Sequence, residues 1–199
     1  MKSLNKYSAF VLSACLVIAA CTETQPFDFV LPLEIDPTFV INDQDGSWSE
    51  SEIITYDDVA DALDDLEDDI DFQSISIEGV SLIIKNQDPA LTGVENVNLT
   101  LIDPFNQSFS IYLGEAISIP AGQQRTEVVV TGLAREGVEA LKDLLESYAL
   151  NEAFDPFTLV STGNSTPANT PLNMDLTVVL HMSFNYSQEL DVPYFLGNQ

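Results

Sequence analysis

The stretch NMDLTVVLHMSFNYSQ, residues 173–188, decides the fold of this chain. Every second position along it is apolar: Met174, Leu176, Val178, Leu180, Met182, Phe184 and Tyr186. Polar residues, among them Asp175 and Asn185, fill positions between these. Because successive side chains of a strand point to opposite faces of a sheet, this alternation predicts a long β-strand with one buried and one wet face.

Shorter segments with the same two-residue period predict the partners of this strand. They cover residues 74–86, 95–103, 107–114 and 125–132, and residues 157–160 are also extended. Connections rich in Pro, Asp, Asn and Gly separate them at intervals of about 8–12 residues, which is typical of a β-sandwich or barrel. The sequence NLTLIDPFNQSFSIYL, residues 98–113, predicts a β-hairpin at the centre of this set.

Residues 27–41 also alternate, but they contain Pro32 and Pro37. Proline cannot donate a hydrogen bond to a sheet, so this segment is expected at a sheet edge or crossing between sheets. Residues 42–51 resemble a polar turn. Trp48 in this turn is either an exposed contact residue or, as we favour, an apolar staple for the helix that follows. Residues 163–171 predict a second long loop.

Two segments break the two-residue period and predict amphipathic helices. Thr55 is a candidate N-cap with Asp58 three residues on, and apolar residues then recur at helical spacing: Val59, Leu63, Leu66 and Ile70. The second helix covers residues 134–150. Aspartates crowd the outer face of the first helix and repel one another, so packing of its apolar stripe must hold it.

We therefore expect a mainly β fold, an antiparallel β-sandwich with two amphipathic α-helices. One domain would span residues 27–195, followed by a short tail at 196–199. The segment SLIIKNQDP, residues 81–89, resembles extended strands followed by Asn and Pro in immunoglobulin-like and late-embryogenesis-abundant type sandwiches. The resemblance is confined to this segment and carries no site.

The first twenty residues have the layout of a secretory signal. Lys2 and Lys6 precede an apolar run at residues 7–20, and small residues stand directly before Cys21. The run is shorter than the roughly 20 residues that a helix needs to cross a bilayer. A signal peptide, removed from the mature chain, is therefore favoured over a membrane-spanning helix.

The sequence Ile18-Ala19-Ala20-Cys21 resembles the lipobox of bacterial lipoproteins. The resemblance implies that the Cys21 thiol is diacylglycerylated, that residues 1–20 are removed and that the new amine is usually acylated. Residues 12–15, Leu-Ser-Ala-Cys, also match the box, but cleavage there would leave a very short apolar run. The alternative is an ordinary signal peptide cut near Ala20 that leaves a free thiol.

A lipid on Cys21 predicts a lipid-anchored cell-envelope protein. Two or three acyl chains, such as palmitate, at about 0.8 kcal/mol per buried CH₂ hold a chain on a membrane far more firmly than one chain does. Thr22 follows the cysteine where an Asp would resemble an inner-membrane retention signal, so the outer membrane is favoured. Residues 22–26 are expected to form a polar tether between the lipid and the folded body.

The mature chain would be strongly acidic. From Cys21 onward it keeps all 32 acidic residues and four basic ones, Lys85, Arg125, Arg135 and Lys142, which gives a formal charge of −28. A field of that sign repels phosphate, so nucleic-acid binding and charge-driven adsorption to anionic lipid are disfavoured. The membrane would be reached through the N-terminal lipid. Both cysteines lie in the leader region and the only one retained, Cys21, would be acylated, so no disulfide is expected.

No enzyme is expected from these residues. His181 is the only histidine in the chain, and its position in the long strand puts it on the polar face. We interpret it as a solvated or hydrogen-bonded strand histidine in preference to a catalytic base. Neither G-x-S-x-G, nor S-x-x-K with its supporting motifs, nor a glycine-rich phosphate loop occurs. No cofactor is expected.

A weak candidate for a calcium site is formed by Asp43, Asp45 and Glu52. With Gly46, these residues resemble positions three, five, twelve and six of an EF-hand loop, but the first ligand position falls on Ile41. The competing interpretation is a polar turn.

The sequence leaves three hypotheses for function. The first is a binding or scaffolding role with an unknown protein partner. The second is carriage of an apolar ligand, such as a lipid, in a β-fold cavity. The third is calcium-dependent adhesion through the Asp43 loop.

Overall fold

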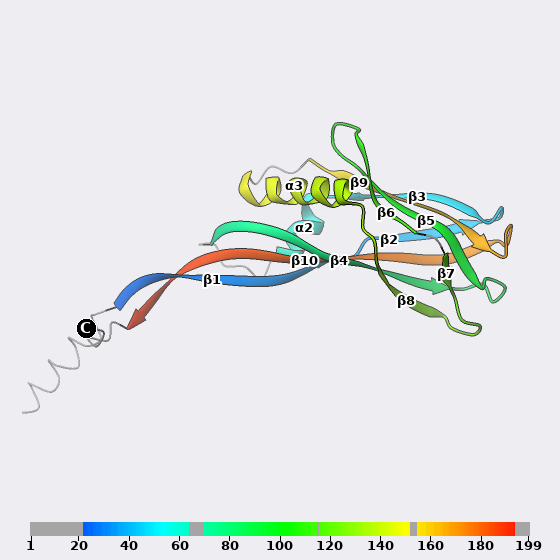
Figure 1. The fold of residues 1–199 in the computed structure, drawn as a ribbon, viewed down its shortest axis with the longest axis horizontal. Coiled ribbons are helices and arrows are strands. Elements are labelled where there is room, and N and C mark those ends of the chain that lie inside the picture. The colour runs from blue at the N-terminus through cyan, green and yellow to red at the C-terminus, as the bar shows by residue number, and fades with distance from the viewer. Residues whose placement is uncertain (1–21, 64–69, 115, 152–154, 194–199) are drawn as a thin grey trace, which may run out of the picture.

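The computed structural model describes residues 22–63, 70–114, 116–151 and 155–193. The expected signal peptide, Cys21 and the expected tail at 196–199 lie outside these residues. Within them the protein is mainly β, with two antiparallel sheets and two helices, as the sequence predicts (Figure 1).

Sheet A has the order β1, β10, β4, β8, with β2 also paired to β10. Its strands are β1 (Thr22–Ile35), β2 (Thr38–Asp43), β4 (Asp71–Asn86), β8 (Arg125–Val130) and β10 (Leu172–Pro193). Sheet B has the order β3, β9, β5, β6, with β7 also paired to β5. Its strands are β3 (Ser47–Ile54), β5 (Gly93–Ile102), β6 (Ser108–Leu113), β7 (Ala116–Ser118) and β9 (Phe157–Thr166).

The long strand β10 organises sheet A, which confirms the central expectation. One side of it pairs with β2 and then β1, and the other side pairs with β4. Its even-numbered side chains from Met174 to Phe184 are each no more than 3% exposed and lie in the core between the layers. The strand exceeds the predicted range because its pairing with β1 continues to Pro193.

The helices also follow the apolar pattern of the sequence. α2 (Tyr56–Leu63) begins after Thr55, whose N–H and hydroxyl both donate to Asp58 Oδ2 at 2.7 Å. Val59 is buried, Leu66 lies outside the described residues, and Ile70 packs on the core beyond the helix. α3 (Arg135–Asn151) buries Leu141 and Leu145, so the apolar stripe predicts its packing face correctly.

The predicted polar turn at residues 42–51 is wrong from Ser47 onward. Only residues 44–46 turn, and Ser47 begins β3. Trp48 is 5% exposed, lies over Gly163 of β9 and donates from Nε1 to Ser161 Oγ at 3.1 Å. Its packing partner is a strand more than 100 residues away in sequence, so its interpretation as a helix staple is wrong.

Three other boundaries differ from the prediction for a similar reason. Residues 22–26, expected as a tether, pair with residues 189–193 as the first part of β1. Residues 163–166, expected as a loop, extend β9. The strand β7 was not predicted. The partners of residues 22–26 and 163–166 in β10 and β3 are distant in sequence, and local composition does not report them.

The two ends of the sandwich differ, and we name them by what they contain. The ribbon end holds the start of β1 and the end of β10, where Thr22 pairs with Pro193. The distal end holds the turns near residues 44–46, 87–92, 119–124 and 167–171 (Figure 1). Backbone hydrogen bonds tie these turns together, including Ser165 N–H to Gly46 O at 2.7 Å and Asn86 N–H to Gln124 O at 3.0 Å.

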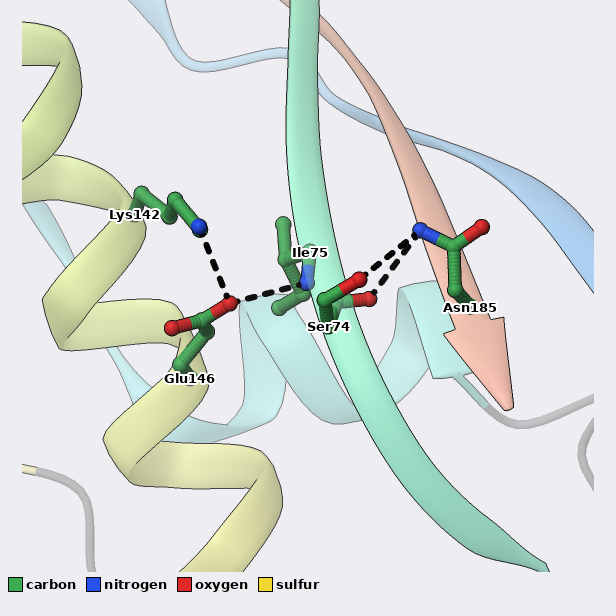
Figure 2. Close-up of polar contacts among 5 residues, drawn as sticks. All are labelled: Ser74, Ile75, Lys142, Glu146 and Asn185. Atoms are coloured by element: carbon green, nitrogen blue, oxygen red, sulfur yellow. Dashed lines mark hydrogen bonds and ion pairs between the residues drawn. The ribbon is translucent and has the colours of Figure 1, made fainter. Parts of the chain in front are cut away.

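A glutamate of α3 closes an open edge of β4. Among the described strands, β8 pairs with β4 only from Val80 to Lys85, so residues 71–79 have a strand on one side alone. Figure 2 shows α3 on the other side, where Glu146 Oε1 accepts the Ile75 N–H at 3.1 Å and pairs with Lys142 Nζ at 3.4 Å. Covering an edge in this way blocks unwanted strand pairing.

We expect Glu146→Ala to lower the free energy of unfolding by about 1 kcal/mol, because it leaves the partly buried Ile75 N–H without its acceptor. Glu146→Gln is the matched control, since its amide oxygen can still accept from Ile75, and it should lose less than half as much. Urea denaturation of the three proteins measures the difference. Equal losses in the two variants would mean that charge, and not the backbone hydrogen bond, matters here.

Candidate functional site

Three strands of sheet A bring a serine, a histidine and a glutamate together on the outer face. Ser81 comes from β4, His181 from β10 and Glu34 from β1. Glu34 lies directly opposite His181, while Ser81 lies opposite Val179, one step along the same face. The odd-numbered side chains of β10 point away from the core, so the sequence predicts the face of His181 correctly.

The three side chains form a continuous hydrogen-bonded chain. Glu34 Oε1 lies 2.9 Å from His181 Nδ1, and His181 Nε2 lies 2.9 Å from Ser81 Oγ. An ionised carboxylate can only accept, so beside Glu34 the neutral imidazole carries its proton on Nδ1. Its Nε2 lone pair then accepts the Ser81 hydroxyl proton. His181 is therefore a hydrogen-bonded strand histidine, as expected, but its two partners were not foreseen.

Solvent exposure increases along the three hydrogen-bonded side chains, from Ser81 through His181 to Glu34. Ser81 is 4% exposed, whereas the side chains of His181 and Glu34 are 37% and 64% exposed. Val179 and Val129 flank Ser81 on the neighbouring strands. Gly79 of β4 lies directly opposite His181, and a Cβ there would meet no other atom within 4 Å. The face next to the imidazole is therefore open.

This arrangement can activate the Ser81 hydroxyl. The nearest backbone hydrogen-bond donor, the Ser81 N–H, is however already used in strand pairing. Ser81 lies in an interior strand and pairs with Val179 on one side and Val129 on the other. Its own N–H is thereby held within the sheet. Efficient acyl transfer needs donors aimed at the oxyanion, and each is worth about 10²–10³ in rate. The geometry supports a nucleophile without the stabilisation that gives rapid turnover.

The structure does not bring the three calcium candidates together, which corrects that prediction. Asp43 Oδ1 accepts the N–H groups of Asp45 at 2.7 Å and Ser47 at 3.3 Å, so it closes its own turn. Glu52 lies five residues farther along the extended strand β3, a distance of about 16 Å from Ser47 at 3.3 Å per residue. An EF-hand folds its twelfth position back onto the first, and a strand cannot do so. Within the described residues, no group of three His, Cys, Asp or Glu side chains is placed to hold a metal.

Glu52 instead lines an acidic depression at the edge of the sandwich. The depression measures about 340 Å³ and is lined by Glu34, Ile35, Asp36, Pro37, Glu52, Ile54 and Asp58. A second depression of about 230 Å³ lies at the distal end, lined by residues 86–89, 91, 120 and 122–124. Its lining combines the amides of Asn86, Gln87, Gln123 and Gln124 with apolar residues such as Leu91 and Pro120.

Cys21, the expected lipidation site, lies just outside the described residues, immediately before β1. Among the helices in the part of the chain that the structure describes, none is both long enough and apolar enough to cross a membrane.

Comparison with known proteins identifies no family. No family model and no curated protein matches the chain. Among solved structures, it is similar to Desmodium yellow mottle tymovirus at 11% identity and a TM-score of 0.30, covering 89% of this chain and 94% of that one. For the decameric BFDV capsid protein, the values are 10% identity, a TM-score of 0.36, and 79% and 99% coverage. At TM-scores below 0.5 these likenesses carry no inference about function.

Proposed function

We propose that this chain is a lipid-anchored cell-envelope protein that acts by binding or scaffolding. The anchor is the acylated Cys21, and the outer membrane is the favoured location. The body is the β-sandwich, which presents its distal end away from the membrane to a protein partner.

One observation carries the proposal: β1 starts at Thr22, the residue after Cys21, and pairs with the end of β10. Residues 22–27 and 188–193 pair with each other before β4 joins the sheet at Asp71, opposite Ser187. A lipid on Cys21 would therefore connect to the body through a two-stranded ribbon. A paired ribbon is stiffer than a free tether, so it would hold the distal end at a defined distance from the bilayer.

The distal end has the features of a polar contact surface. Its turns are fastened to one another by backbone hydrogen bonds, so little ordering entropy is lost on binding. The side-chain amides of Gln87, Gln123 and Gln124 in its depression can both donate and accept. Binding of a partner at the surface fits better than carriage of an apolar ligand inside the body, because both depressions described above lie at the surface while large side chains such as Phe39, Phe157 and Phe184 fill the core.

Intact-mass analysis of the purified membrane-fraction protein tests the anchor and the carrier hypothesis together. We expect a mature chain that begins at Cys21 and carries fatty acyl groups, and globomycin should block its processing. Native mass spectrometry should show no passenger lipid. An unmodified thiol on a secreted chain would contradict the anchor, and a stoichiometric lipid inside the body would favour the carrier.

A further inference from the structure

We propose that Ser81 is an activated nucleophile that accepts an acyl group from a small activated ester and keeps it. The target class is aryl and thiol esters with short acyl chains. This activity goes beyond the proposed binding role and does not depend on the lipid anchor.

The Ser81 hydroxyl is activated because Glu34, His181 and Ser81 are hydrogen-bonded in that order. The Glu34 carboxylate fixes the imidazole so that Nε2 faces Ser81, at 2.9 Å for both contacts. A nucleophile within reach of a base that is itself oriented by a third group is the recurring arrangement of nucleophilic serines, whatever the fold. His181 is the only histidine in the chain, so no other hydroxyl can be activated by an imidazole.

A second serine on the same face provides the internal comparison. Ser183 lies two residues from His181 and donates its hydroxyl to Glu78 Oε1 at 2.9 Å. Its partner is a carboxylate without an imidazole, and a carboxylate is the weaker base for removing a serine proton. Ser183 should therefore stay unreactive under conditions that modify Ser81.

Gly79 leaves space for the acyl donor. It lies opposite His181 in the register of β4 and β10. A Cβ at this position would meet nothing within 4 Å, so the surface of β4 beside the imidazole is open to an incoming ester. A short acyl group entering there approaches Ser81 along the face on which His181 is exposed.

Transfer of the acyl group from the ester to Ser81 needs no further reactant. Ser81 Oγ attacks the carbonyl carbon of the ester and forms a new C–O bond, while its proton passes to His181 Nε2. The bond from the carbonyl carbon to the leaving oxygen or sulfur then breaks, and His181 returns the proton to that leaving group. The products are acyl-Ser81 and one alcohol or thiol.

Strand pairing at Ser81 predicts that the acyl group stays bound to the serine. The Ser81 N–H is used in pairing with the flanking strands, so it does not stabilise the oxyanion. Each missing oxyanion donor slows acyl transfer by about 10²–10³. A good leaving group compensates for this in the first step, but water attacking the Ser81 ester has no such help. We therefore expect one acylation per chain and little turnover.

The test uses p-nitrophenyl acetate with the purified full-length protein. We expect a burst of about one equivalent of p-nitrophenolate per chain, with the acetyl group mapped to Ser81 by peptide mass analysis. Ser81→Ala should abolish the burst, and His181→Gln should slow it about a hundredfold through loss of the general base. Gly79→Val should slow it about tenfold by covering the open surface beside the imidazole, while Ser183→Ala should leave it unchanged.

Melting temperatures and circular dichroism spectra of each variant show whether the sheet is intact. If Ser81→Ala folds poorly, the Gly79→Val variant still tests the proposal. Acetylation that maps only to Lys85 or Lys142, or a burst that persists in His181→Gln, would overturn the proposal. So would the absence of any burst in the unmodified protein.

Discussion

Replacing Gly137 with alanine is expected to destabilise the protein by about 2 kcal/mol, although alanine favours a helix over glycine by about 1 kcal/mol. Gly137 lies in the first turns of α3 and is buried against β6. A Cβ there would overlap the carbonyl oxygen of Ser110 and lie 2.5 Å from its carbonyl carbon and 2.8 Å from Ile111 N. These are backbone atoms of a paired strand, so they cannot move aside as a side chain could.

The expected loss combines this overpacking, which costs about 1–3 kcal/mol or more, with movement of α3 away from β6. The N–H of Ala134 also donates to Ile111 O at 2.8 Å, so the same movement strains the start of the helix. Urea denaturation measures the effect. Gly79→Ala is the control, because its added methyl meets open space, and it should change stability by less than about 0.5 kcal/mol. Equal stability of the two variants would contradict the close approach of helix and strand.

Replacing Cys21 with alanine is expected to move the protein from the membrane fraction to the soluble fraction. The acyl chains would supply about 0.8 kcal/mol per buried CH₂, and a body with a charge of −28, from 32 acidic and four basic residues, is repelled by anionic lipid. Little else on the described surface would hold it at a bilayer. Fractionation and immunoblotting of cells that express each variant measure the distribution.

Cys15→Ala is the matched control, because residues 12–15 also fit the lipobox. It should remain in the membrane fraction and should be processed normally. If Cys15→Ala is released and Cys21→Ala is retained, the anchor lies at the earlier cysteine, and six more residues would separate it from β1. Retention of both single variants would contradict a lipid anchor at either position.

The sequence predicts the elements whose signals are local. The alternation in β10, the hairpin of β5 and β6 and the apolar stripe of α3 all appear in the fold as expected. Pro32 and Pro37 correctly indicate an edge, since β1 and β2 border sheet A. These features depend on residues within about one element of each other, where periodicity and turn chemistry are informative.

Features that depend on distant pairing could not be predicted in the same way. The polar residues of β3 and the end of β9 resemble loops until Trp48 is seen to lie over Gly163. The candidate site depends on register: Ser81 is 100 residues and Glu34 147 residues from His181 in sequence. Alternation predicts which face His181 occupies but not which side chains oppose it. The weak calcium candidate is not assembled, because its spacing requires a bent loop where Glu52 lies in the extended strand β3.

The pairing of β1 with β10 has a mechanical consequence. Hydrogen bonds between antiparallel strands run across the strand axis, and β1 is matched to β10 from Thr22↔Pro193 to Ile35↔Leu180. Tension applied at Thr22 along that axis would shear these bonds together, whereas a sideways pull would open them one after another. Axial load is therefore shared along the whole of β1, and the strand nearest the N-terminus resists extraction under tension.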